Sequence, residues 1–321
     1  MWQAKAQWGA LAVAIVAAVN AVALADPPAA EEPAVTPEQI ARLIAQLDAD
    51  KFDDRERATR ELAEIGWPAM EALRQARLSK SAEVRYRAKA LIESLTFEVR
   101  RREFTAFCSQ PDEQLDLEHG LWLIARILDP AVKKADLVKQ LDDLAARVRQ
   151  QLPKGTDPAT ENPAVVVAAV RKVLFDDLKF TGNTQDYYHP DNSSLARVLE
   201  TKQGLPILLS QVTMAVGRRL RVPIVGVPAG GRYLVKYDGS RAPAGFSQDD
   251  IYFSPFESGR LLTENERPAG VVWEGPREDL TRTLRNLIPA LESRPERSDE
   301  LKAAQELFEL LVAHAPQPMP R

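Results

Sequence analysis

Apolar residues recur every three or four positions along most of the chain from residue 36 onwards. The segment Thr36-Pro37-Glu38-Gln39 combines a capping box with a proline at the first helical position, so a helix is predicted to begin there. The same periodicity predicts a second helix over 53–66 and two more over 68–78 and 81–95. The first part of the chain is therefore expected to be helical.

One sequence pattern occurs twice within this helical part. Asp53-x-Arg55-x-Arg57-Ala58 recurs 30 residues later as Glu83-x-Arg85-x-Arg87-Ala88. Helix pairs with this spacing resemble HEAT-like repeats, so 36–95 is interpreted as an N-terminal HEAT-like helical layer. Such repeats form concave surfaces that bind partners, but so short a series can equally act as a helical cap on the next domain. The arginines are expected either to be solvated or to pair with nearby acids, namely Glu56, Glu61 and Glu83.

The pattern then changes from helices to short strands and back to helices. Helical spacing continues over 97–179 and is interrupted by proline-containing breaks. Short β-branched or aromatic segments predict strands over 222–227, 233–237, 251–253 and 271–273. Helices are expected again over 279–291 and 299–313. This order predicts an α+β fold that is mostly helical and contains a small antiparallel sheet.

The first 25 residues have the organisation of a secretory signal peptide. A single charge at Lys5 precedes an Ala, Val and Leu run over 8–24, and Ala23-Leu24-Ala25 supplies small residues for cleavage. We expect cleavage after Ala25, a linker over 26–35 and a periplasmic or secreted protein. The alternative is an uncleaved membrane anchor, and membrane attachment is expected only in that case.

Charge and composition argue against several functions. With 42 Lys and Arg against 46 Asp and Glu, the formal net charge is -4, which leaves no basic excess for binding nucleic acid. His119, His189 and His314 lack metal-ligand spacing, so neither a zinc site nor any other cofactor is expected. Cys108 is the single cysteine and lies in an apolar helical segment. It is interpreted as a core residue rather than as the nucleophile of a Cys108–His189 pair.

Four motifs follow one another between residues 180 and 237. They are Phe180-x-Gly182-Asn183, Tyr187-Tyr188-x-Pro190-x-Asn192-Ser193, Val198-Leu199 followed by Gly204, and Gly226-Val227 before a strand. In this order and spacing they resemble a bacterial transglutaminase-like family known as regulators of sirC expression. The resemblance covers roughly 112–315. It implies a transglutaminase/papain-like core over 112–275 and a C-terminal helical pair over 276–315, similar to the tetratricopeptide-type tail of that family.

Transglutaminase-like chemistry needs a cysteine nucleophile at a helix N-terminus, a histidine base and an orienting aspartate. The resemblance places these roles at Pro206, Arg232 and Ser254. Proline has no nucleophilic atom, arginine has no neutral form that accepts a proton, and serine supplies no negative charge. Pro206 instead suits the first turn of a helix with a buried apolar stripe over 208–220.

The three substitutions favour an exported, non-catalytic binding or scaffold protein whose partner is a protein or peptide. The alternative is a hydrolase or acyl transferase of the same superfamily that uses an unrecognised nucleophile. A third possibility, a structural regulator in the cytoplasm, requires the signal-peptide interpretation to be wrong.

A binding groove is the site that the resemblance implies, because the fold places Pro206, Arg232 and Ser254 around one cleft. The candidate groove residues are Arg232, Tyr233, Tyr187, Tyr188, His189 and Asn192. The Arg232 guanidinium is expected to bind a carboxylate or phosphate of the partner. The alternative is an internal ion pair between Arg232 and an acid such as Glu257.

Overall fold

The computed structural model of the chain describes residues 35–268 and 275–315. The described residues form two compact units, which divide between Thr96 and Phe97. The expected signal peptide and nearly all of the expected linker lie outside the described residues. None of the described helices is both long enough and apolar enough to cross a membrane.

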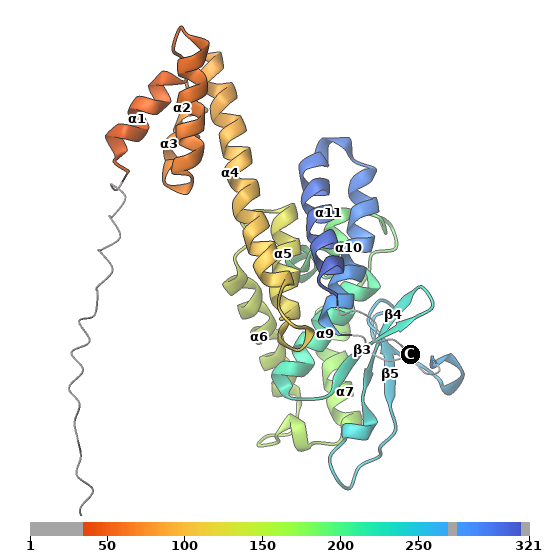
Figure 1. Cartoon of the computed structure of the whole chain (residues 1–321). Coiled ribbons are helices and arrows are strands. Elements are labelled where there is room, and N and C mark those ends of the chain that lie inside the picture. Colours follow the sequence, from red (N-terminus) through yellow and green to blue (C-terminus); the bar gives the residue numbers. More distant parts are fainter. Residues whose placement is uncertain (1–34, 269–274, 316–321) are drawn as a thin grey trace, which may run out of the picture. The chain divides into compact units, whose positions relative to one another are not determined.

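The first unit is helical (Figure 1). It contains α1 (Pro37–Gln46), α2 (Phe52–Ile65), α3 (Met70–Ala76) and the first part of α4 (Ala82–Cys108). The Thr36 hydroxyl accepts a hydrogen bond from the Gln39 amide at 3.2 Å, which is the N-terminal cap that the sequence predicts. The apolar faces of these helices meet in a separate small core that includes Leu47, Leu62 and Leu73.

The repeated arginines hold this unit together. Arg55 Nη1 donates to the carbonyl oxygens of Ala49 at 2.7 Å and Asp50 at 3.0 Å. Arg85 Nη1 donates in the same way to the carbonyl oxygens of Ser79 and Lys80, both at 2.8 Å. Each therefore ties its own helix to the preceding loop. Arg87 joins α2 to α4 through Glu56 at 2.8 Å and also binds Glu83 at 2.6 Å. Pairing with Glu56 and Glu83 is thus confirmed, and these three arginines are structural.

Helix α4 differs from its predicted end at residue 95. It continues to Cys108 because no glycine or proline interrupts 82–108 and because Phe104 and Phe107 supply a second buried face. These two phenylalanines belong to the core of the second unit, whereas Leu91 and Leu95 belong to the core of the first.

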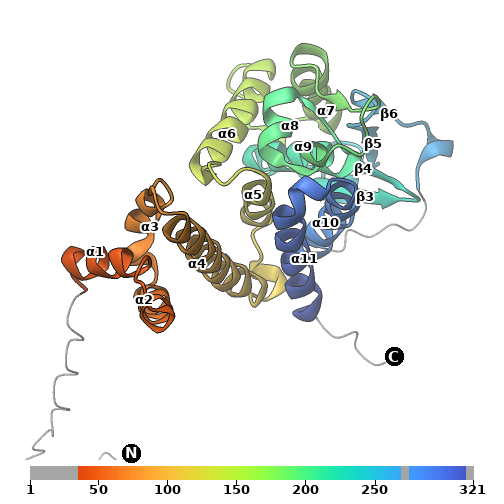
Figure 2. The same ribbon diagram turned by 90° about the horizontal axis from the view of Figure 1, so that it is seen from above.

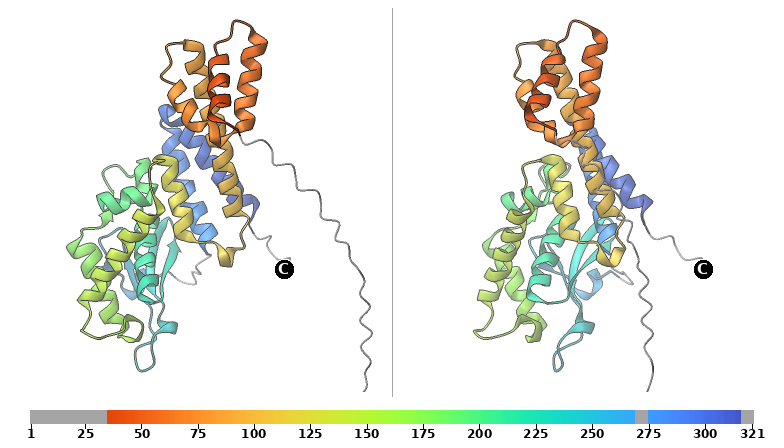
Figure 3. Two further views of the ribbon diagram at one scale, coloured as in Figure 1. Left: turned by 90° about the vertical axis from the view of Figure 1, so that its left-hand side faces the viewer. Right: turned by 60° about the vertical axis from the view of Figure 1, so that its left-hand side comes forward.

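The second unit confirms the α+β prediction, with helices before and after a small sheet. The helices are α5 (Leu117–Leu128), α6 (Lys134–Gln151), α7 (Pro163–Arg171), the π-helix η4 (Lys172–Asp177), α8 (Leu195–Thr201), α9 (Pro206–Leu220), α10 (Pro276–Glu292) and α11 (Ser298–Ala313). Figure 3 shows α10 and α11 as an antiparallel pair. A further pairing joins two short parallel strands, β1 (Thr181–Gly182) and β2 (Gln203–Gly204).

The main sheet is antiparallel, in the order β3-β4-β5-β6. Its strands are β3 (Ile224–Ala229), β4 (Arg232–Tyr237), β5 (Ile251–Ser254) and the unpredicted β6 (Arg260–Leu261). Gly230 and Gly231 connect β3 to β4 with φ angles of 50° and 83°, as a tight two-residue hairpin turn requires. The strand predicted over 271–273 lies outside the described residues.

Helix α9 is the centre of the second unit. It begins at Pro206, its predicted apolar stripe is buried, and the polar residues Ser210, Gln211 and Thr213 are buried as well. Figure 2 shows α9 between α6 and the sheet, and both contact it. A helix that is buried on every side is typical of a domain core, so α9 fixes the position of the loops at its N-terminus.

Candidate functional site

Three segments surround the N-terminus of α9, where the resemblance places the nucleophile. They are the β1–β2 pair, the loop over 183–192 and the turn over 254–259. Main-chain hydrogen bonds connect them: the Gly182 amide donates to Phe256 at 2.9 Å, and the Asn183 amide donates to Gly204 at 3.2 Å. We call this region the α9 loop cluster.

Two motif glycines allow these segments to approach closely. A side chain at Gly182 would overlap the Phe256 ring, and one at Gly204 would overlap the Val198 side chain. Neither glycine has the positive φ angle that would itself demand glycine. Their role is therefore steric, since the missing side chain leaves room for a neighbour.

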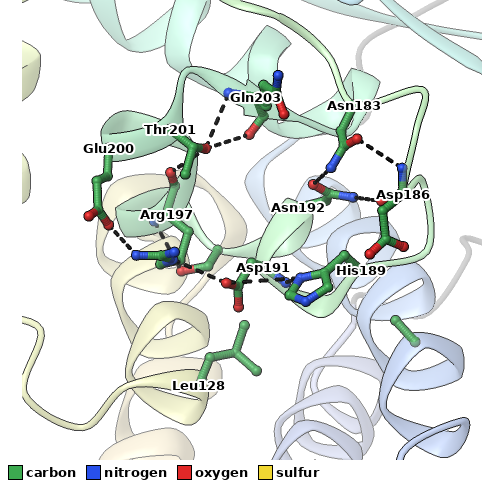
Figure 4. Close-up of polar contacts among 12 residues, drawn as sticks. Leu128, Asn183, Asp186, His189, Asp191, Asn192, Arg197, Glu200, Thr201 and Gln203 are labelled. Carbon is green, nitrogen blue, oxygen red and sulfur yellow. Dashed lines mark hydrogen bonds and ion pairs between the residues drawn. The ribbon is translucent and has the colours of Figure 1, made fainter.

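Asn192 organises the loop over 183–192 from within (Figure 4). Its Nδ2 donates to the carbonyl oxygens of Asp186 at 2.6 Å and Tyr187 at 3.0 Å, and its Oδ1 accepts from Asn183 Nδ2 at 3.0 Å. The Asn192 residue is only 3% exposed. Its polar atoms are engaged inside the protein, so Asn192 supports the candidate groove and does not face a ligand.

The neighbouring aromatic residues differ in their exposure. Tyr187 is partly buried and packs edge-on against Phe256, with ring centroids 5.9 Å apart. Tyr188 is 75% exposed. His189 Nδ1 accepts from the Asp191 amide at 3.2 Å, so a neutral His189 carries its proton on Nε2. Tyr188 and His189 are thus the members of the predicted set that reach solvent in this loop.

Figure 4 also shows how Asp191 fixes the entry to α8. Its carboxylate accepts from Arg197 Nε at 3.1 Å, and Arg197 forms a further ion pair with Glu200. The Ser194 hydroxyl caps the helix by accepting from the Arg197 amide at 3.5 Å. The polar residues that follow the tyrosines therefore stabilise a helix start.

The structure does not place Arg232 with the α9 loop cluster. Side chains alternate along β4: Tyr233, Val235 and Tyr237 pack in the core beside α9, whereas Leu234 packs in a small cluster with Val227. Arg232 shares the face of Leu234 and is exposed. Arg232 therefore lies on the face of β4 opposite to that of Tyr233, and its place in a groove with the loop residues stays a prediction.

Tyr233 also takes a different role from the predicted one. It is 5% exposed, and its hydroxyl donates to the carboxylate of the buried Asp279 on α10. Tyr233 thus connects the sheet to the C-terminal helical pair. The alternative prediction, an ion pair between Arg232 and Glu257, is not observed. Glu257 binds Arg260 at 3.1 Å, and Arg232 forms no ion pair within the described part of the chain.

Ser254 ends β5 as a structural residue. It is 3% exposed, its carbonyl oxygen accepts from Gly259 at 2.8 Å and its hydroxyl accepts from the Glu257 amide at 3.3 Å. These bonds close the turn over 254–259. Ser254, where the resemblance places an orienting aspartate, therefore shapes a turn of the α9 loop cluster.

The remaining candidate groups show no activated nucleophile. Burial raises the pKa of the Cys108 thiol to about 12, although Arg277 opposes the shift, so this buried thiol is protonated at neutral pH. His119 stacks on Phe107, with ring centroids 5.2 Å apart, and burial together with Lys134 lowers its pKa. Over 35–268 and 275–315, no three His, Cys, Asp or Glu residues group as metal ligands would.

One buried polar cluster was not predicted from the sequence. Gln211 Nε2 on α9 donates to Thr283 Oγ1 on α10 at 3.2 Å, beside Asp279. Gln211 Oε1 is buried without a protein partner. The available signal was Gln211 on the face of α9 that the apolar stripe predicts to be buried, but helical periodicity alone does not show which neighbour Gln211 meets.

Comparison with known families agrees with this geometry. Residues 135–273 match the model described as the transglutaminase-like superfamily. The matched range includes α6 to α9, β3 to β6 and the α9 loop cluster. The second unit therefore has a transglutaminase-like core, as the motifs indicate.

Individual relatives come from eukaryotes and bacteria. The chain is 28% identical over 205 residues to the mouse (Mus musculus) protein named F-box only protein 21, which covers 58% of this chain and 33% of the relative. The chain is 39% identical over 102 residues to a UPF0162 protein of Xylella fastidiosa strain Temecula1, and the match covers 31% of this chain and 33% of that relative. A UPF0162 protein of Pseudomonas aeruginosa is 28% identical to the chain over 163 residues, and the match covers 51% of this chain and 54% of that relative. The chain thus spans between a third and about half of the length of these relatives. No solved structure matches it.

Proposed function

We propose that this chain, with its transglutaminase-like core, is an exported binding or scaffold protein that has no transglutaminase-like catalysis. The observation that carries the proposal is Pro206 at the first position of α9. A helix N-terminus activates a cysteine by favouring its thiolate, and proline offers no atom that can attack a substrate. Ser254, engaged in its turn, and Arg232, on the other face of the sheet, supply neither of the remaining roles.

The alternative is a hydrolase or acyl transferase with another nucleophile, and the chemistry of the chain disfavours it. The Cys108 thiol has a raised pKa and is buried on α4. Ser193, Ser194 and Ser254 are each at most 3% exposed. A nucleophile must reach its substrate and have a base within hydrogen-bond reach, and these residues do not meet both conditions.

Activity-directed labelling tests the proposal. The folded chain is treated with a thiol-directed probe and, separately, with a serine-directed probe, and the modified residue is identified by mass spectrometry. We expect Cys108 to react only after unfolding, because burial protects the thiol. Stoichiometric labelling of Cys108 or of one serine in the folded state, lost on unfolding, would support the catalytic alternative instead.

The partner in this proposal is a protein or peptide. Two exposed aromatic side chains support this class: Trp67 in the first unit is 55% exposed, and Tyr188 in the α9 loop cluster is 75% exposed. Exposed aromatic residues are enriched where proteins bind one another.

A capture experiment uses the mature chain as bait in envelope extract, beside the variants Trp67→Ser and Tyr188→Ser. Val312→Ser serves as the control because Val312 is also half exposed, at 50%, but is not aromatic. We expect at least one aromatic variant to lose a partner that the control retains. Equal capture by all four proteins would argue against both surfaces.

A further inference from the structure

Two adjoining pockets lie on the second unit, and Lys202 of one of them directly precedes β2 of the α9 loop cluster. They have volumes of about 500 and 150 Å³ and share Asp143, Arg147 and Leu178. The walls come from α6, from the π-helix η4 and, for the smaller pocket, from the end of α8. Figure 2 shows α6 beside α8, and the two helices are in contact.

The smaller pocket contains two cations without an acidic partner. Arg147 and Lys202 both line it, and among the described residues neither forms an ion pair. Two acids nearby already have other partners: Asp143, which lines both pockets, binds Lys139 at 2.8 Å, and Asp177 in the larger pocket binds Lys172 at 2.9 Å. Neither acid is therefore the ion-pair partner of Arg147 or Lys202.

The ammonium group of Lys202 is held in place. It donates a hydrogen bond to the Leu199 carbonyl oxygen and lies 4.9 Å from the centre of the Phe180 ring. Burial and the nearby Arg147 both lower the pKa of Lys202. A bound anion would relieve this repulsion, because it would attract both cations at once.

The backbone at Lys202 adopts a conformation that lysine disfavours. Lys202 ends α8 with a φ angle of 64°, in the left-handed region where glycine or asparagine is usual. A lysine at this position costs stability that a glycine would not. Residues held in such conformations cluster at functional sites, and η4 is a π-helix, another feature frequent at such sites.

We propose that the smaller pocket is a binding site for an oxyanion, either a carboxylate or a phosphate, held between the Arg147 guanidinium and the Lys202 ammonium group. The guanidinium supplies paired N–H donors in one plane, and the ammonium supplies a point charge. The rest of the ligand extends into the larger pocket, where Gln150 and Gln151 offer amide groups for hydrogen bonds.

The test is a calorimetric titration of the whole mature chain with three probes. These are inorganic phosphate, a tripeptide with a free C-terminal carboxylate and the same tripeptide as its amide. Binding of phosphate alone assigns the site to a phosphate group, and binding of the free tripeptide but not of its amide assigns it to a peptide carboxylate. Absence of binding by every probe at roughly 10 mM, well above a millimolar dissociation constant, overturns the proposal.

Variants separate binding from folding. Arg147→Gln and Lys202→Asn should each weaken binding by about tenfold, the effect of losing roughly 1.4 kcal/mol. Lys202→Asn should also leave the melting temperature unchanged or raise it, because asparagine tolerates the left-handed conformation. Arg149→Gln and Lys154→Gln remove the same charges from exposed positions outside both pockets and serve as controls. Binding by the two pocket variants at the level of the controls would refute the site.

Discussion

At the scale of single residues, the motifs of the α9 loop cluster act through packing and internal hydrogen bonds. Gly182 and Gly204 leave room for neighbouring side chains, and Asn192 fills the inside of the loop over 183–192 with three hydrogen bonds. The proposal of a non-catalytic protein rests on two residues at this scale, because Pro206 begins α9 and Ser254 closes a turn.

Asn192→Ala should destabilise the fold. The substitution leaves the carbonyl oxygens of Asp186 and Tyr187 without their side-chain donor in a partly buried place, so we expect a loss of about 2 kcal/mol in the free energy of unfolding. Urea unfolding measures this loss. The control is Asn286→Ala, an exposed asparagine that donates to one carbonyl at 3.0 Å, for which less than about 0.5 kcal/mol is expected. Equal effects of the two variants would contradict the internal role of Asn192.

Arg232→Ala should leave stability nearly unchanged. Arg232 is exposed and unpaired within the described residues, so the expected change in the free energy of unfolding is within about 0.5 kcal/mol. Arg277→Ala is the contrasting variant, because the 4%-exposed Arg277 binds Asp112 at 2.5 Å and three carbonyl oxygens. Its loss should cost about 3 kcal/mol or more. A cost near 2 kcal/mol for Arg232→Ala in urea unfolding would show a structural ion pair in solution.

At the scale of elements, charged groups join helices that are distant in sequence. Glu118 on α5 binds Arg218 at 2.7 Å and Arg219 at 2.5 Å, both on α9, and Arg219 also binds Asp142 on α6 at 2.6 Å. Burial alone would raise the pKa of Glu118, but the hydrogen bonds from the two arginines outweigh it and lower the pKa. This group therefore stabilises the packing of α5, α6 and α9 only while Glu118 is ionised.

The pH dependence of Glu118→Gln follows from this shift. Because the pKa is lower in the folded chain than its ordinary value of 4.5, the stabilisation is present above about pH 4.5 and is lost as the pH falls through the folded value. We expect the variant to lose about 2 kcal/mol at pH 7 and to approach the parent at strongly acidic pH. Urea unfolding at several pH values checks this, with the exposed Glu113→Gln as the control. A difference from the parent that stays constant with pH would rule out the ion-pair explanation.

At the scale of the whole molecule, the chain combines a small helical unit with a transglutaminase-like core. Three of the repeated arginines of the first unit, Arg55, Arg85 and Arg87, are occupied in holding its helices, so the proposed partner is expected to meet exposed aromatic side chains instead. The second unit carries the two features on which the binding proposals rest, the exposed Tyr188 and the proposed oxyanion pocket.

Export is the prediction that belongs to the whole chain. We expect the mature protein to begin at Asp26, because Ala23-Leu24-Ala25 provides the small residues that signal peptidase cleavage requires. N-terminal sequencing of protein from the envelope fraction should read Asp-Pro-Pro. An intact Met1 on membrane-bound protein would support the uncleaved anchor.

The sequence by itself determined features that depend on one segment of backbone. Thr36 predicted the cap of α1 and Pro206 the start of α9, because the conformational preferences of a few adjacent residues decide each of them. Periodicity also predicted the order of helices and strands. It missed the true end of α4, because the apolar contacts that extend this helix come from the second unit's core.

Only the tertiary structure decided which side chains meet. Alternation along β4 turned Arg232 away from α9 and buried Tyr233, although the two residues are adjacent in sequence. Arg147 and Lys202 come together because α6 packs beside α8, a contact that no local pattern encodes. The physical reason is that backbone preferences act within a segment, whereas burial and charge pairing act between segments that the fold brings together.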